Sequence, residues 1–275
     1  IDNKLDPLFL NYFKDNSEKY DRVILGGDFI YDCTSKEELK NFSNFYSNYN
    51  VNLVLGNHDI CSPVIELLQK SKDSSVDRYE SIGQNLIFFL NTSIENLEKI
   101  NDKLEFIEGV IKKESPKNII IFSHQIIFSK SDWYLRVNSR KYYQFGNNLY
   151  DKLYKKYYDT DRNFYFVAGD IGAFNFTPFS FYENDSNFTL LASGIGNDFN
   201  TNGIIIEIGD NINTKFIDLK SGKKFENKKY RKIKVQLYQF PKLVLFKLKK
   251  NYLFILSIIV TLILVYLFQN RLKKR

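Results

Sequence analysis

The residues of this 275-residue chain that could do chemistry gather at the ends of four short apolar runs. After each run come small residues and then side chains that can bind a metal ion or move a proton: Gly26-Gly27-Asp28, Gly56-Asn57-His58-Asp59, Ser123-His124 and Gly169-Asp170. The chain has two His, and both lie in these segments. Carboxylate, amide oxygen and imidazole suit hard or borderline divalent ions, and glycine lets the backbone approach such an ion closely. The four segments therefore predict a metal centre.

The apolar runs themselves predict buried strands in an alternating α/β fold. We expect strands at 22–25, 51–55, 85–91, 118–122 and 163–168, helices at 36–49, 62–72 and 94–113, and later strands at 188–193, 203–208 and 215–219. Asp6-Pro7 predicts the start of a first helix, with Asp as N-cap and Pro at the first helical position. Open α/β sheets bind ligands outside the carboxyl ends of their strands, which is where the four segments lie.

The start of the chain suggests an incomplete sheet. A helix runs directly into the strand at 22–25, whereas a right-handed βαβ unit needs one more strand before that helix. The chain also contains no Met and begins at Ile1. We therefore expect that a first strand is missing from this chain.

At these residues the sequence resembles the calcineurin-like metallophosphoesterases, whose motifs run Asp-x-His, Gly-Asp, Gly-Asn-His-Asp/Glu, a His and Gly-His-x-His. The resemblance covers about residues 5–220, and its middle three motifs are clear. It implies a four-layered α/β/β/α sandwich with two divalent metal ions, whether Mn, Fe, Mg or Zn. It also implies hydrolysis of a phosphate ester by in-line attack of a hydroxide that bridges the two ions.

The same resemblance implies the metal ligands. Asp28 would bridge both ions, Asn57 and His124 would bind one of them, and Asp170 would replace the first His of the last motif. The sequence departs from the family motifs in two places: the chain has no Asp-x-His, and Gly172 occupies the position of the last His. The resulting site is rich in oxygen ligands, which favours Mn²⁺, Fe or Mg²⁺ over Zn²⁺.

His58 is the residue implied for proton transfer. It would stay off the metal, steady the transferring phosphoryl oxygens and protonate the leaving oxygen, because imidazole suits a general acid near neutral pH. An acidic neighbour, either Asp59 or Asp32, would orient it and raise its basicity. In the family this acid often stands three positions after the bridging Asp, a position occupied here by Tyr31.

Structural interpretations of the same residues remain open. The two His could be hydrogen-bonded core residues, and Asp28 and Asn57 could be turn residues after strands. Two Cys exclude a disulfide scaffold, and we expect Cys33 and Cys61 to be small buried thiols rather than ligands or a disulfide. The aromatic residues that follow His124 would form either a substrate lid or ordinary packing: Trp133, Tyr134, Tyr142 and Tyr143.

The C-terminal tail differs from the body in charge and in hydropathy. Residues 223–275 hold fifteen Lys and Arg against one acidic residue, a net of +14, so residues 1–222 carry −7 of the total of +7. Residues 252–268 contain no charge, Gly or Pro, and as a helix they would span roughly 26 Å. We expect a metallophosphoesterase-like domain (1–222), a basic juxtamembrane linker on anionic headgroups (223–251), one transmembrane helix (252–268) and a basic tail (269–275).

These features favour a membrane-anchored, metal-dependent phosphoesterase whose phosphorylated substrate is of unknown class. Four basic residues flank the apolar segment on each side, so the positive-inside rule does not decide its orientation. The negative net charge of the body disfavours nucleic acid as a partner. The alternative is a catalytically inactive, metallophosphoesterase-like binding module tethered to the membrane, which the two departures from the family motifs favour.

Overall fold

The computed structural model describes residues 7–30, 33–49, 51–69, 77–92, 98–128, 143–171, 180–194 and 202–226, together with 240–242, 244–245, 248–249 and 251–252. The chain divides into two compact units, residues 1–230 and 231–275. All of the helices and strands named below belong to the first unit.

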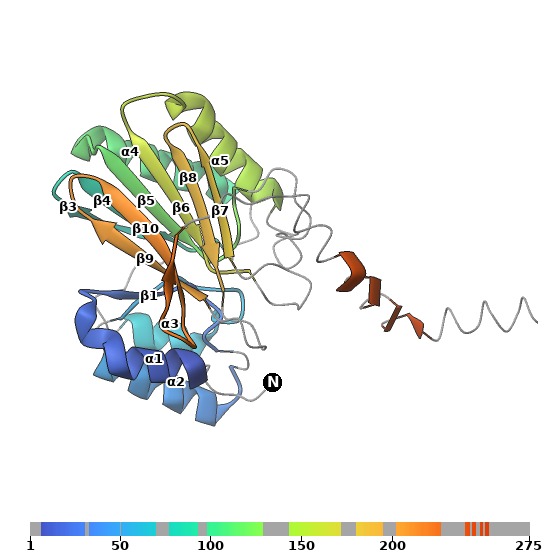
Figure 1. Ribbon diagram of the computed structural model, residues 1–275. Helices are drawn as coiled ribbons and strands as arrows, with labels where there is room; N and C mark the ends of the chain where they lie inside the picture. Colours follow the sequence, from blue (N-terminus) through green and yellow to red (C-terminus); the bar gives the residue numbers. More distant parts are fainter. Residues whose placement is uncertain are drawn as a thin grey trace, which may run out of the picture. The chain divides into compact units, whose positions relative to one another are not determined.

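A six-stranded mixed sheet forms the centre of the first unit, in the order β3-β4-β5-β6-β8-β7 (Figure 1). Its strands are β3 (Arg78–Ile82), β4 (Asn85–Leu90), β5 (Asn118–Ser123), β6 (Asn163–Ala168), β7 (Ser180–Asp185) and β8 (Phe188–Ser193). The inner strands β4, β5, β6 and β8 pair in parallel, and the two edge strands are antiparallel. Every residue of β4 and β5 is buried, which explains why these strands read as continuous apolar runs.

Two smaller sheets make up the second β layer. Strand β1 (Val23–Leu25) pairs in parallel with β2 (Val51–Leu53), and β10 (Ile212–Asp218) pairs antiparallel with both β9 (Asn202–Ile208) and β11 (Lys224–Phe225). Successive side chains of these strands point to opposite faces. Phe216 thus packs in the core shared with the large sheet, whereas Ile217 packs in the core shared with the N-terminal helices.

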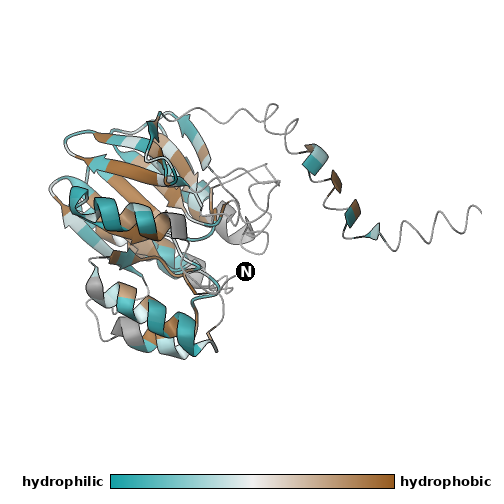
Figure 2. Cartoon of the chain, turned by 60° about the horizontal axis from the view of Figure 1, so that its bottom comes forward, coloured by the Kyte–Doolittle hydropathy of each residue, from teal (hydrophilic) through white to brown (hydrophobic). Residues whose placement is uncertain are grey.

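In the described part of the chain, α-helices cover the outer faces of the two β layers (Figure 1). Helices α4 (Glu98–Glu114) and α5 (Tyr143–Tyr157) share one core with the large sheet, and residues of α1 (Pro7–Asn16), α2 (Lys36–Asn48) and α3 (Ser62–Gln69) share another with β1, β2 and β10. A 3₁₀ turn, Ser17–Lys19, follows α1. Figure 2 shows apolar residues along the strands and hydrophilic residues along the exposed sides of the helices. Three cores between four layers confirm the predicted α/β/β/α arrangement.

The sequence pattern placed most of these elements but missed α5, β3, β7 and the short strand β11. Helix α5 was not expected, because the aromatic residues that follow His124 were interpreted as a lid or as packing; Tyr150 and Tyr157, which lie in this helix, are core residues. The edge strands β3 and β7 were also missed. Both are only partly buried and therefore lack the apolar run that marks the inner strands.

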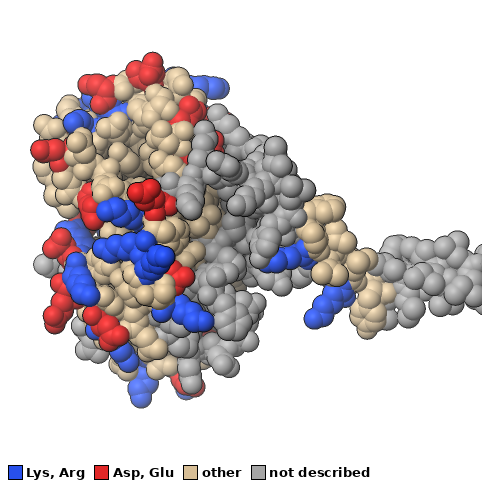
Figure 3. Space-filling view, in the orientation of Figure 1, with Lys and Arg blue, Asp and Glu red and all other residues tan. Residues whose placement is uncertain are grey.

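The second unit is described only in short pieces between Phe240 and Tyr252, where the large apolar side chains are exposed: Phe240, Val244, Leu245, Leu248 and Tyr252. Among the residues described, no helix has the length and hydropathy needed to cross a bilayer. The expected transmembrane helix at 252–268 lies outside the described residues, except for Tyr252. In the first unit, the face seen in Figure 3 carries side chains of both charge signs.

Candidate metal centre

Two glycines let the carboxyl ends of β1 and β6 touch. Gly26 follows β1 and Gly169 follows β6, and a Cβ added to Gly169 would clash with the Gly26 carbonyl oxygen. Next along the chain, Gly27 has φ +96°, and a Cβ there would clash with the ring of His124. Only glycine permits such close backbone contacts. They place Asp28, the next residue, near the segment that follows β5.

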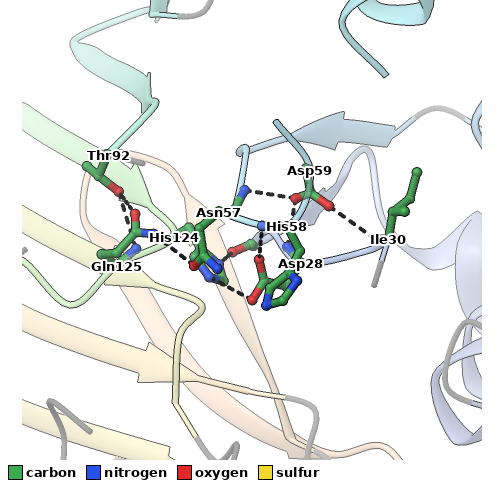
Figure 4. A network of polar contacts seen from close by, with 10 residues as sticks. Asp28, Ile30, Asn57, His58, Asp59, Thr92, His124 and Gln125 are labelled. Atoms are coloured by element: carbon green, nitrogen blue, oxygen red, sulfur yellow. Dashed lines mark hydrogen bonds and ion pairs between the residues drawn. The ribbon is translucent and has the colours of Figure 1, made fainter. Parts of the chain in front are cut away.

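Asp28 and His124 form the centre of the site (Figure 4). The Nδ1–H of His124 donates to the Gly26 carbonyl oxygen at 2.7 Å, because a carbonyl can only accept. The other ring nitrogen, Nε2, lies 3.2 Å from Asp28 Oδ2 and is buried without a hydrogen-bond partner of its own. Asp28 itself has φ +56°, an uncommon conformation for a residue other than glycine. The ring is thus held by one nitrogen and presents the other to a carboxylate.

Each member of this pair shifts the pKa of the other. Burial alone would raise the pKa of Asp28, but His124 and the backbone N–H of His58 bring it below its ordinary value. Burial alone would lower the pKa of His124, but Asp28, Asp170 and the Gly26 carbonyl raise it to about 9. Without a metal ion, the pair therefore behaves as a carboxylate beside an imidazolium.

Asp59 joins the loop after β1 to the loop after β2. Its fully buried carboxylate accepts hydrogen bonds from the N–H groups of Asp28 at 2.7 Å, Ile30 at 3.1 Å and Gly56 at 2.8 Å. Burial raises the pKa of Asp59 to about 6. Sequence reasoning expected Asp59 or Asp32 to orient His58. The bonds of Asp59 go to backbone amides, none of them to His58, and Asp32 lies outside the described residues.

Asn57 and His58 lie at the exposed side of the site. The backbone N–H of His58 donates to Asp28 Oδ1 at 3.1 Å. Asn57 Oδ1 accepts from Gln125 Nε2 at 3.4 Å, and the hydroxyl of Thr92 donates to Gln125 Oε1 (Figure 4). Sequence reasoning missed Gln125 and Thr92, although Gln125 directly follows His124. Both are fully buried, and together they orient the amide of Asn57.

Asp170 lies beside His124 on the β6 side. Its N–H donates to the His124 carbonyl oxygen at 2.8 Å, and its side chain is largely buried. Its negative charge contributes to the raised pKa of His124. The structure therefore brings together six of the predicted site residues: Asp28, Asn57, His58, Asp59, His124 and Asp170. Gly172 lies outside the described residues.

The donor set of the site suits a divalent ion. Two ligands at right angles on one ion, each about 2.1 Å from it, lie about 3.0 Å apart. The 3.2 Å between Asp28 Oδ2 and His124 Nε2 is close to that spacing, and Asn57 adds an amide oxygen nearby. In the described part of the chain, no cluster of three or more His, Cys, Asp and Glu side chains could hold a metal. The fit therefore depends on the amide of Asn57 as well as on the Asp28–His124 pair.

The two cysteines form a disulfide, which corrects the expectation of two buried thiols. Cys33 and Cys61 are bonded, with their Cα atoms 6.2 Å apart. Their spacing of 28 residues gave no sign of this, because it is the parallel pairing of β1 and β2 that brings the following loops together.

Comparison with known proteins identifies the family of the chain. The sequence matches the family model described as calcineurin-like phosphoesterase over residues 4–171, more than half of its length, and the chain belongs to this family. A double mutant of Vps29 from Entamoeba histolytica is similar in structure, with 10% sequence identity, 82% of this chain and 90% of that chain covered, and a TM-score of 0.35. A search of the curated proteins found no match.

Proposed function

We propose that this chain is a metal-dependent phosphoesterase that hydrolyses a phosphate ester. One observation carries the proposal. The His124 ring is fixed through Nδ1 to the Gly26 carbonyl, and its buried Nε2 lies 3.2 Å from the Asp28 carboxylate. Metal-binding histidines are commonly held in this way, with one ring nitrogen bonded to a backbone carbonyl and the other directed at the ion beside a carboxylate ligand.

Asp28, Asn57 and His124 are the residues that would hold a divalent ion, with the predicted ligand Asp170 beside His124. When bound, such ions would lower the pKa of a water molecule and stabilise the charge of the transferring phosphoryl group. Asp28 would supply the anionic charge that a bound divalent cation requires. The Gln125 amide holds the Asn57 side chain in place, and the Gly26 carbonyl selects the tautomer of His124 that leaves a lone pair on Nε2.

His58 would deliver the proton. Its backbone is fastened to Asp28 by a 3.1 Å hydrogen bond, and the residue is exposed at the mouth of the site, where a phosphate ester would enter. The leaving oxygen of an alcohol must gain a proton to depart as a neutral molecule. A positioned imidazolium can supply that proton. Asp59 acts on the backbone: its carboxylate keeps the Asp28 loop and the His58 loop together.

A second function, that of a binding module without catalysis, is favoured by the same site. The described residues offer no cluster of three titratable ligands, and the sequence lacks both Asp-x-His and the last His of the family pattern. On this alternative, the centre would bind a ligand or partner through one metal ion and would not turn over a phosphate ester.

We also propose that residues 252–268 anchor the domain in a membrane, with the basic segment 223–251 on anionic headgroups. Support comes from the uncharged apolar run and the Lys and Arg residues on both sides of it. Alkaline carbonate should leave the full chain in the membrane fraction and should release a chain that ends at residue 251. Release of the full chain would contradict the anchor.

Hydrolysis of an aryl phosphate by the full-length protein with Mn²⁺ tests the enzymatic proposal. We expect turnover that requires the metal ion. A chelator should stop it, and Asp28→Asn should abolish it. Binding of Mn²⁺ without turnover of mono- or diesters would favour the binding module. Turnover that persists unchanged in both Asp28→Asn and His58→Ala would contradict the mechanism.

A further inference from the structure

The Cys33–Cys61 disulfide joins the two loops that carry the site. Cys33 comes five residues after Asp28, and Cys61 comes three residues after His58. The strands that lead into these loops, β1 and β2, have only three residues each. Regular sheet pairing therefore ends before the loops begin, and other contacts must hold the two loops in position.

The conformation of the Asp28 loop needs such support. Gly27 has φ +96° and Asp28 has φ +56°, and an unfavourable backbone conformation persists only where its surroundings hold it. On the inner side, the Asp59 carboxylate bonds to amides of both loops, and the His58 N–H donates to Asp28 Oδ1. Further along each loop, after Asp28 and after His58, the covalent bond between Cys33 and Cys61 joins the same two loops.

We propose that the Cys33–Cys61 disulfide is a positioning tie for the metal centre and makes the centre sensitive to redox conditions. The proposal rests on the proposed metal-dependent function. With the bond formed, the Asp28 loop and the Asn57–His58 loop keep the spacing that a divalent ion needs. With the bond open, only hydrogen bonds, those of the Asp59 carboxylate and that from the His58 N–H to Asp28, hold the loops, and the centre loses affinity for the ion.

The redox step is a thiol–disulfide exchange with a dithiol. The dithiol gives two electrons and two protons to the Sγ atoms of Cys33 and Cys61, which become thiols, and its own two sulfurs close to a disulfide. The chain has two Cys, so a reductant has no other target in it. Disulfides persist in oxidising compartments, so the tie would stay closed there and would open in the presence of such a dithiol.

The bond is tested first in protein taken from cells. Thiols are blocked with N-ethylmaleimide at lysis, and the digested full-length protein is analysed by mass spectrometry. We expect a Cys33–Cys61 cross-linked peptide. Both cysteines recovered as alkylated thiols would overturn the proposal.

The effect of the bond is tested by opening it in the purified full-length protein. Dithiothreitol is applied and then removed by gel filtration under nitrogen, because the reductant itself binds metals. Hydrogen exchange is followed at the amides bonded to the Asp59 carboxylate, and Mn²⁺ affinity is measured by calorimetry. We expect faster exchange in both loops, unchanged exchange in β5, and Mn²⁺ affinity lower by about tenfold or more, the range found when groups that orient metal ligands are lost.

Two control variants separate positioning from general stability. The double variant Cys33→Ser/Cys61→Ser should resemble the reduced protein and should not respond to the reductant. Asn163→Ala, which removes a hydrogen bond at the far end of the sheet, should lower the melting temperature and keep the wild-type Mn²⁺ affinity. Reduced protein with two free thiols, unchanged loop exchange and unchanged Mn²⁺ affinity would overturn the tie. Faster loop exchange with no Mn²⁺ binding in either state would support the tie and contradict the proposed metal function.

Discussion

The two ends of the central strands carry different kinds of polar side chain. At the amino end, Asn85, Asn118 and Asn163 begin β4, β5 and β6 and lie in register. The Asn118 amide donates to Asn85 at 2.8 Å, and the Asn163 amide donates to Asn118 at 2.9 Å. At the carboxyl end lie a charged pair, Asp28 and His124, with a ring nitrogen that has no hydrogen-bond partner.

This difference shows how a structural polar cluster can be told from a ligand site. The asparagine ladder (Asn85, Asn118 and Asn163) is neutral, and its amides satisfy one another, so it stabilises strand register and leaves nothing to offer a ligand. The Asp28–His124 pair is charged and incompletely hydrogen-bonded, and it depends on backbone conformations that only close contacts maintain. Binding of an ion to such a site would stabilise the folded protein further.

The largest effect is expected from Asp28→Asn at the carboxyl end. The change removes the anionic ligand while keeping the shape of the side chain, so both Mn²⁺ binding and hydrolysis should fall to background. Calorimetry and an aryl phosphate assay measure the two. Wild-type Mn²⁺ affinity in this variant would show that the ion binds elsewhere.

His58→Ala should lower kcat by about 10²–10⁴-fold, the usual contribution of a general acid. Mn²⁺ affinity should change little, because His58 stays off the metal. The loss should be smallest for esters whose leaving group is already acidic, such as a nitrophenyl phosphate, since these need less protonation. An equal loss for acidic and basic leaving groups would contradict the role of proton donor.

Asn118→Leu tests the amino end of the same strands. Its side chain is buried, and its loss removes the donor to Asn85 Oδ1 and the acceptor for the Asn163 amide, so the free energy of unfolding should fall by about 1–3 kcal/mol. Urea denaturation measures this change. Hydrolysis per folded molecule should stay at the wild-type level, and a large loss of activity would break the distinction between the two ends.

The smallest effect is a pH dependence of the melting temperature of the metal-free protein. The pKa of His124 is raised to about 9, above its ordinary value, so the stabilisation from the imidazolium is complete below about pH 6.5 and is lost as the pH rises through 9. The lowered pKa of Asp28 adds stability above about pH 4, which is lost as the pH falls further. The melting temperature should therefore fall between pH 6.5 and 9.

The variants at the two ends should separate in this experiment. His124→Asn should lose the decline between pH 6.5 and 9, whereas Asn118→Leu should keep it, because the ladder has no titrating group. The same decline in His124→Asn would assign it to other groups in the protein.

The sequence predicted the fold best where an apolar run stands between turn residues. The runs at 163–168 and 188–193 coincide with β6 and β8. Helix α5 and the edge strands β3 and β7 were missed, because aromatic-rich or alternating segments of this kind do not distinguish a helix, a strand and a loop without their tertiary contacts.

The residue types of the site were also predicted, and their partners were not. Asp28 and His124 meet as expected, because strand ends of an α/β fold converge. The buried carboxylate of Asp59 bonds to backbone amides of a loop some thirty residues away, and no local pattern reveals such a contact. The disulfide depends in the same way on the paths of two loops in space.

Anomalous diffraction from crystals of the full-length protein grown with Mn²⁺ tests the metal centre most directly. The account predicts an anomalous peak in contact with the Asp28 carboxylate, His124 Nε2 and the Asn57 amide oxygen. A peak bound elsewhere, or no peak at saturating Mn²⁺ with Asp28 and His124 still paired to each other, would contradict it.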